Sequence, residues 1–173
     1  QAERYRTQMR QQLGYADSDV VIIKIARLFP LKGHRDLLQA AREVCSQSPQ
    51  ARFLLVGDGS LRETFAQQTK QMGLEHVVRF AGLVPPSEIP KWLSAADLLV
   101  HTSLREGLPR ALPQALLTGI PVVAYDVDGA REVALLAQTG FLVPPGNIEQ
   151  LVVDLVQLVQ SPDLRQRMGT AGR

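Results

Sequence analysis

Apolar runs and amphipathic segments alternate along almost the whole chain. Residues 20–26 form an apolar run rich in β-branched residues, typical of a buried strand, and residues 35–46 repeat apolar positions at helical spacing. The same alternation continues toward the last residue. We expect further strands at 52–56, 77–81, 97–101, 121–125 and 140–143, and further helices at 60–72, 87–95, 110–118, 131–137, 148–159 and from 163 onward.

The boundaries of several helices carry local signals. Ser60, with Glu63 three residues later, predicts a capping box, and Ser87 predicts a second serine N-cap. Gly73 and Gly119 follow apolar periodic segments and predict helix ends. Residues 1–19 are expected to form a leading helix or linker.

Strand and helix in regular alternation predict crossover units and a parallel sheet. The expected strands are apolar on both faces, as they must be when helices cover both sides. The sequence therefore predicts one α/β domain over residues 1–173, a Rossmann-like doubly wound parallel sheet of about six strands.

Composition narrows the classes of function. Hydrophobic residues make up 45% of the 173 residues and aromatic residues only 5%, so the core should be aliphatic. The net charge of +2 is spread along the chain, which argues against a nucleic-acid partner. Cys45 is the single cysteine, so no disulfide can form within the chain and a reducing, cytoplasmic location is expected. No run of 18 apolar residues occurs.

Ligands of doubly wound sheets bind at the carboxyl ends of the strands, so the loops that leave strands matter most. The loop after the first expected strand contains Arg27, Lys32 and Gly33. Two cations beside the start of a helix suit an anionic group such as a diphosphate. The alternative is two surface cations in a turn.

The loop after the fourth expected strand contains Glu106, Gly107 and Pro109 before a helix begins. Free amides at that helix start would hold phosphate, while Glu106 would face sugar hydroxyls. The alternative for Glu106 is an acid that stabilises the helix through its dipole. His34 and His101 lie near these two loops, where a structural role is the first expectation and ligand contact the second.

Two further loops carry weaker signals. Gly57 and Gly59 form a glycine pair, but Arg62 occupies the place where a dinucleotide fingerprint has its third Gly or Ala, which argues against a nicotinamide cofactor. Asp126 and Asp128 follow the fifth expected strand without a third ligand nearby in sequence, so a turn is preferred over a metal site.

Seven short sequence motifs occur in a distinctive order along the chain. They are Arg27-Leu28 with Lys32-Gly33, Val56 to Gly59, Val78 to Gly82, Ala96-Asp97 with Ser103 to Gly107, Gly119 to Ala124, Gly129 to Glu132, and Thr139 to Gly146. Together they resemble the retaining glycosyltransferases of the GT-B fold known as family 4, or group 1. The resemblance runs from Val20 to Arg173 and covers the carboxyl-terminal, donor-binding half of that fold.

The resemblance implies roles for these residues. Arg27 and Lys32 would bind the donor diphosphate and stabilise the leaving nucleotide, and Glu106 would contact the donor sugar. The other implied donor contacts are Gly57, Gly59, Leu83, Val84, Gly107, Leu108 and Gln114. The donor would be a UDP- or GDP-linked sugar, transferred with retention of configuration, and neither a metal nor a further cofactor would be needed.

The resemblance also implies a missing partner and contains one departure. The acceptor site would lie on an amino-terminal domain absent from this chain, so this chain alone should transfer no sugar. Peripheral association of the full protein with the inner face of a membrane is also expected, since many relatives modify lipid-linked acceptors.

Position 114 is Gln114, where the family usually has a second glutamate for the ribose hydroxyls. Donor binding should therefore be weaker, or the nucleotide preference altered.

Four interpretations therefore stand at this point. The first is the donor half of a glycosyltransferase, and the second is half of a sugar-nucleotide epimerase or phosphorylase. The third is a non-catalytic nucleotide or interaction module on the same fold, which Gln114 would favour. The fourth is a nicotinamide-dependent enzyme.

Overall fold

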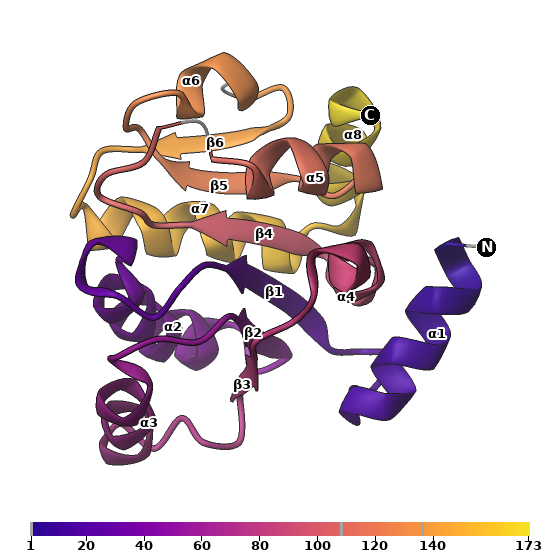
Figure 1. The fold of residues 1–173 in the computed structure, drawn as a ribbon. Coiled ribbons are helices and arrows are strands. Elements are labelled where there is room, and N and C mark those ends of the chain that lie inside the picture. The colour runs from indigo at the N-terminus through magenta and orange to yellow at the C-terminus, as the bar shows by residue number, and fades with distance from the viewer. Residues whose placement is uncertain (1, 108, 136) are drawn as a thin grey trace.

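The computed structural model describes residues 2–107, 109–135 and 137–173. Its centre is one six-stranded sheet in which every strand pairing is parallel, in the order β3-β2-β1-β4-β5-β6 (Figure 1). The strands are β1 (Val20–Ile25), β2 (Ala51–Val56), β3 (Val78–Gly82), β4 (Leu98–His101), β5 (Val122–Tyr125) and β6 (Gly140–Val143). The doubly wound α/β fold predicted from the sequence is confirmed.

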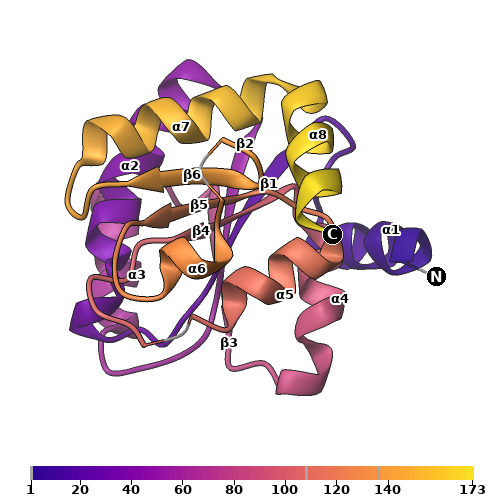
Figure 2. The ribbon, with the colours of Figure 1, turned by 90° about the horizontal axis from the view of Figure 1, so that it is seen from above.

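Helices cover both faces of this sheet (Figure 2). The helices are α1 (Ala2–Leu13), α2 (His34–Gln47), α3 (Arg62–Gln71), α4 (Ile89–Ala95), α5 (Ala111–Thr118), α6 (Ala130–Val133), α7 (Ile148–Gln160) and α8 (Pro162–Gly172), with short 3-10 helices η1 (Pro30–Lys32) and η2 (Pro86–Glu88). One core lies between the sheet and α2, α3 and α7, and the other between the sheet and α1, α4, α5 and α6.

The two cores follow from the pleat of the strands. In β1, Ile22 packs into the α2 and α7 side, while Val21 and Ile23 pack into the α4 and α5 side, because successive side chains of a strand point to opposite faces. All three side chains are fully buried. This explains why the strands read as continuous apolar runs rather than as alternating ones.

Two predicted helix caps are wrong. Helix α3 begins after Leu61 and α4 after Glu88, and neither has a side-chain cap. The backbone N–H of Leu61 instead donates to Leu28 O at 3.0 Å, which sets the start of α3 beyond Ser60. Ser87 lies inside η2, where Pro86 favours a tight turn.

Two predicted helix ends are confirmed, while another helix is shorter than expected. Gly73 and Gly119 have φ of +69° and +82° and end their helices in the left-handed conformation that suits glycine. Helix α6 ends at Val133, because the backbone of Ala134 is already extended.

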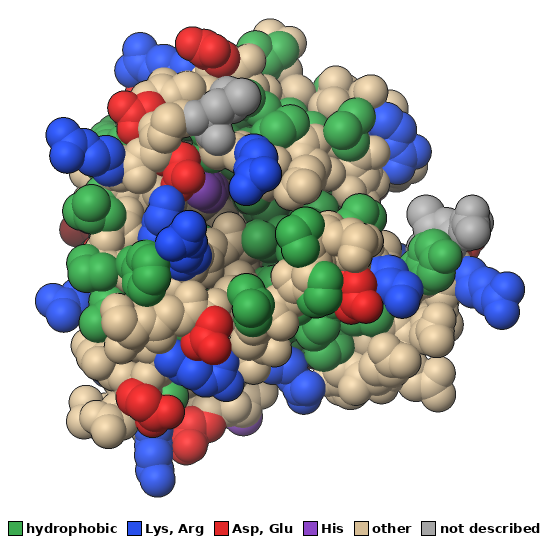
Figure 3. All heavy atoms as spheres, in the orientation of Figure 1, with side chains coloured by type: hydrophobic (Ala, Val, Ile, Leu, Met, Phe, Trp, Pro, Cys, Tyr) green, Lys and Arg blue, Asp and Glu red, His purple; other side chains and the backbone are tan. Residues whose placement is uncertain are grey.

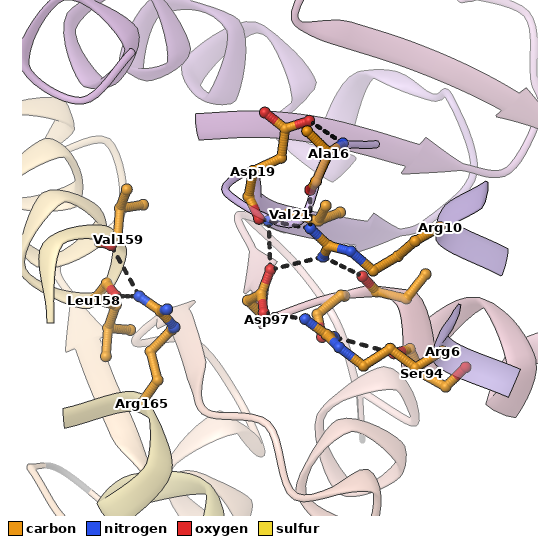
Figure 4. A network of polar contacts seen from close by, with 12 residues as sticks. Arg6, Arg10, Ala16, Asp19, Val21, Ser94, Asp97, Leu158, Val159 and Arg165 are labelled. Carbon is orange, nitrogen blue, oxygen red and sulfur yellow. Dashed lines mark hydrogen bonds and ion pairs between the residues drawn. The ribbon is translucent and has the colours of Figure 1, made fainter. Parts of the chain in front are cut away.

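Helix α1 is fastened to the amino-terminal edge of the sheet by a polar network (Figure 4). The carboxylate of Asp97 accepts hydrogen bonds from Arg6 at 2.7 Å, from Arg10 at 3.2 Å and from the backbone N–H of Val21 at 2.7 Å. Arg10 also donates to three backbone carbonyls, and its side chain is almost entirely buried. The network joins α1 to the segment that leads into β4.

The strand order reverses between β1 and β4. From β1 the chain proceeds outward to β2 and β3, and from β4 it proceeds in the other direction to β5 and β6. The loops that follow β1 and β4 therefore diverge from neighbouring strands and leave a crevice at the carboxyl edge of the sheet.

Candidate functional site

A tight turn at Gly33 brings the loop after β1 into contact with the end of β4. Gly33 has φ of +68°, and a Cβ at this position would lie 1.8 Å from the backbone oxygen of Thr102. The hydroxyl of Thr102 donates to the carbonyl oxygen of Gly33 at 2.8 Å. Only glycine fits at this position. The close contact of Gly33 with Thr102 therefore determines the position of the preceding Lys32 relative to the end of β4.

Lys32 and Glu106 form an ion pair across the crevice. The Lys32 Nζ lies 2.7 Å from Glu106 Oε2, and the two side chains are 24% and 23% exposed. Burial alone would raise the pKa of Glu106, but the hydrogen bond and charge of Lys32 outweigh it, so the pKa lies below its ordinary value. Glu106 is therefore a carboxylate at neutral pH and accepts hydrogen bonds.

The loop that carries Glu106 is tied to its neighbours on both sides. The backbone N–H of Glu106 donates to Asp128 Oδ2 at 2.7 Å, and the N–H of Gly129 donates to Gly107 O at 3.4 Å. On the other side, the N–H of Leu104 donates to Leu31 O at 2.9 Å. Loops that follow β1, β4 and β5 thus form one surface.

Two adjoining pockets open on this surface. The larger has a volume of about 1240 Å³ and is lined by Phe29, Pro30, Leu31, Lys32, Ser60, Arg105, Glu106, Gly107, Asp128, Gly129 and Glu132. The smaller has a volume of about 560 Å³ and is lined by Ile25, Ala26, Arg27, Phe29, Lys32, Val84, Pro86, Ile89, His101, Glu106, Pro109, Arg110, Ala111 and Gln114. Phe29, Lys32 and Glu106 belong to both walls, so the ion pair stands where the two pockets meet.

The space-filling view shows the same region from outside. In Figure 3, basic and acidic side chains lie side by side, with a histidine visible between them, over the ends toward which β4 and β5 point. Both pockets are wide enough for a ligand of the size of a nucleotide or a sugar.

Most of the predicted site residues lie in these walls. The smaller pocket brings together Arg27, Lys32, Val84, Glu106 and Gln114 from four separate segments of the chain. Gly107 lines the larger pocket beside Lys32 and Glu106. The start of α5 also faces the smaller pocket, because Pro109, Arg110 and Ala111 line it.

The glycine pair lies outside both walls. A Cβ on Gly57 would lie 2.1 Å from Ala26 O, and a Cβ on Gly59 would lie 2.7 Å from Leu28 O. Both glycines therefore let the loop after β2 pack against the loop after β1, and their donor contact stays a prediction. Leu83 is 82% exposed and lines neither pocket, and its donor contact also stays a prediction. Leu108 lies outside the described residues.

The two histidines differ in their surroundings. His34 is buried against the ring of Phe65, with ring centroids 5.3 Å apart, which is a structural role. His101 lines the smaller pocket, with its Nε2 3.6 Å from Glu106 Oε2. Burial lowers the pKa of both imidazoles to about 3, helped by nearby lysines, so both are neutral at neutral pH.

The acidic loop after β5 is occupied with structural contacts. Asp126 pairs with Arg131, while Asp128 holds the backbone of Glu106. Across the described residues, no group of three or more His, Cys, Asp or Glu side chains is arranged to hold a metal ion. The same residues contain no helix that is both long and apolar enough to cross a membrane.

Two side-chain contacts near this site were not predicted from the sequence. Asp128 was interpreted as part of a turn, although its carboxylate supports the loop of Glu106. Lys24 was included in an apolar run, although its side chain is completely buried and donates to Thr102. A lysine inside an otherwise apolar strand was the signal that could have found it.

Known proteins share both the sequence pattern and the fold. Residues 5–173 match the family described as "Glycosyl transferases group 1". A GDP-mannose-dependent alpha-(1-6)-phosphatidylinositol monomannoside mannosyltransferase of Mycolicibacterium smegmatis is 31% identical over 97% of this chain and 46% of its own length. The chain thus spans less than half the length of this relative.

Two solved structures are similar. The Anabaena protein HepE, in complex with UDP and glucose, has a TM-score of 0.87 and 31% identity, over 98% of this chain and 46% of that one. The carboxyl-terminal domain of the group 1 family protein LpcC from Francisella tularensis has a TM-score of 0.85 and 25% identity, over 96% of this chain and 88% of that one. Because the family match covers nearly every residue and the fold agrees, the chain belongs to the group 1 glycosyl transferases of the GT-B fold.

Proposed function

We propose that this chain is the donor-binding half of a glycosyltransferase that moves a sugar from a UDP- or GDP-linked donor to an acceptor hydroxyl, with retention of configuration. The observation that carries the proposal is that Arg27, Lys32 and Glu106 line one pocket, at the point where strand order reverses. The complex of HepE with UDP and glucose supports a nucleotide and a sugar as the ligands.

The cations suit the chemistry of a departing diphosphate. As the bond to the sugar breaks, the leaving nucleotide gains negative charge, which Arg27 can hold with two parallel N–H groups. Lys32 has three N–H donors and only one is used by Glu106, so it can bind a phosphate oxygen as well. Arg110 and the first amides of α5 add positive potential to the same wall. The proposal therefore needs no metal ion.

The other residues that line the pockets suit different parts of the donor: the base and ribose in the smaller pocket, and the sugar where the larger pocket begins. Val84 offers an apolar contact for the base, and Gln114 offers one acceptor and one donor group to the ribose hydroxyls. Glu106, held as a carboxylate, accepts hydrogen bonds from hydroxyls of the donor sugar where the larger pocket begins. The larger pocket is then the side from which an acceptor approaches.

A titration of the isolated chain tests the proposal. We expect UDP or GDP to bind, and NAD to bind no better than a bare phosphate compound, in isothermal titration calorimetry. Arg27→Ala and Lys32→Ala should each weaken nucleotide binding by about tenfold or more, since a charged hydrogen bond contributes about 1.5–3 kcal/mol. Arg35→Ala is the matched control, because Arg35 is an exposed cation of α2 outside both pockets.

The outcomes separate the competing functions. Binding of NAD in preference to UDP and GDP would contradict the proposal, and binding of no nucleotide would favour an interaction module. We further expect no sugar transfer by this chain alone, because the acceptor site is proposed to lie on an amino-terminal domain. Measurable transfer to an added acceptor would refute that division of labour.

Gln114 allows a separate test of the ribose contact. We expect Gln114→Glu to tighten UDP or GDP binding by several-fold, because a charge-assisted hydrogen bond is roughly twice as strong as a neutral one. The effect should be absent for the bare nucleobase and for pyrophosphate, which carry no ribose. Unchanged binding of the intact nucleotide would remove Gln114 from the ribose site and favour the non-catalytic alternative.

A further inference from the structure

Lys24 is the most unusual side chain of the core. It lies in the middle of the apolar strand β1 and has 0% exposure, and its Nζ donates to the hydroxyl of Thr102 at 3.0 Å. Burial of an ammonium group is strongly unfavourable unless partners compensate it. A methionine would fill this space without the cost of burying an ammonium group. The amine of Lys24 therefore suggests a role beyond packing.

The contacts of Lys24 lead directly to the crevice. The hydroxyl of Thr102 accepts from Lys24 and donates to the carbonyl oxygen of Gly33. Gly33 follows Lys32, whose Nζ is paired with Glu106. A chain of two hydrogen bonds therefore runs from the buried amine to the turn that positions Lys32.

Ionisable groups on several neighbouring segments lie around Lys24. The ionisable groups that interact with it are Asp36 and His34 on α2, Lys32 at η1, His101 on β4, and Glu106 in the loop after β4. Tyr125 on β5 donates its hydroxyl to Asp36. Burial lowers the pKa of Lys24 to about 7, Glu106 and Asp36 oppose this effect, and Lys32 adds to it. The two histidines stay neutral at this pH.

We propose that Lys24 is a positioning residue of the donor site, which holds the Lys32–Gly33 turn through Thr102 and takes up a proton when a donor diphosphate binds. The inference rests on the proposed function, since it needs an anion at Lys32. A bound diphosphate offsets the charge of Lys32 and so relieves the repulsion that Lys32 exerts on Lys24. By linkage, donor binding must then weaken as the pH rises and Lys24 becomes neutral.

Calorimetry with UDP-glucose and GDP-mannose tests this coupling, because the phosphates of these two probes keep a constant charge across the range. We expect the affinity of the wild-type chain to fall about fivefold or more between about pH 6 and about pH 8.5. Titrations near pH 7.5 in two buffers of different ionisation enthalpy should show net proton uptake. That measurement needs no variant.

Variants separate the charge from the hydrogen-bond chain. Lys24→Met should bind more weakly than wild type near pH 6, with no proton uptake and a flat pH profile. Thr102→Val, which keeps the amine but removes the link to Gly33, should weaken binding at every pH while the slope persists. Lys70→Met removes an exposed lysine of α3 and should match wild type.

Each result decides between the two proposals. Proton uptake by wild type that Lys24→Met abolishes supports the inference. A pH-independent affinity of wild type, or a slope that persists in Lys24→Met, overturns it and leaves the proposed function intact. If the wild-type chain binds neither nucleotide sugar at any pH, the proposed function fails and the inference fails with it.

Discussion

Asp128 lines the larger pocket and also supports the loop that carries Glu106. Its φ of +46° lies in the left-handed region, which is unfavourable for a residue other than glycine, although Asp tolerates it better than most. In that conformation its carboxylate accepts the backbone N–H of Glu106 at 2.7 Å. We infer that Asp128 keeps the loop of Glu106 at the distance at which Glu106 pairs with Lys32.

A pair of variants tests this support. Asp128→Gly relieves the backbone strain and removes the acceptor, so the free energy of unfolding should change by less than about 1 kcal/mol while UDP-sugar binding weakens about threefold or more. Asp128→Asn keeps an acceptor oxygen and tolerates the same conformation, so it should bind nearly as wild type does. Calorimetry and urea denaturation of both variants measure the two effects. Equal donor affinity in Asp128→Gly and wild type would show that the loop needs no such support.

At the level of single residues, the sequence predicted which edge of the sheet carries the candidate site residues, but it did not predict the contacts among them. Lys32 and Glu106 were expected at one edge because each follows a buried strand, and their pairing agrees with that expectation. The hydrogen bonds from Lys24 to Thr102 and from the backbone N–H of Glu106 to Asp128 join residues 78 and 22 positions apart. Such pairings depend on the register and spacing of strands, and no local pattern encodes them.

Among the elements, α1 has the clearest dependence on polar contacts. It packs against α4, and its two arginines converge on Asp97 (Figure 4). Arg10 also donates to Ala16 O and Asp19 O, both at 2.7 Å, so it ties the helix to the segment that leads into β1. The position of α1 therefore depends on a nearly buried cation rather than on its apolar face alone.

Removal of that cation should loosen the helix. Arg10→Met leaves Asp97 with one fewer partner and several carbonyls unsatisfied, and we expect it to lower the free energy of unfolding by about 3 kcal/mol. Arg4→Ala, on the exposed side of the same helix, should change it by less than about 0.5 kcal/mol. Urea denaturation followed by circular dichroism compares the two. Equal stability of both variants would mean that apolar packing alone holds α1.

The elements themselves were predictable, but the starts of helices α3 and α4 were not. Strand β6 begins and ends where the apolar pattern places it, since turn-forming residues bound it on both sides. The serine caps failed because tertiary contacts took precedence, namely the bond from Leu61 to Leu28 O and the 3-10 turn that contains Ser87. A local cap signal competes with such contacts and can lose.

For the whole molecule, the order of the strands places the site. Because β1 and β4 are neighbours, the loops that carry Lys32 and Glu106 face each other, although 74 positions separate the two residues. The alternation in the sequence predicted the parallel sheet, which is confirmed. The family motifs predicted that these loops bind the donor, which stays a prediction. The pocket walls also contain Phe29, Pro30 and Arg110, which lie outside all seven motifs.

A crystal structure of this chain with UDP would test the central claim most directly. The account predicts diphosphate oxygens within about 3.2 Å of Lys32 Nζ and of the Arg27 guanidinium, with the uracil ring beside Val84. UDP bound away from these residues, with the ion pair of Lys32 and Glu106 undisturbed, would contradict the account.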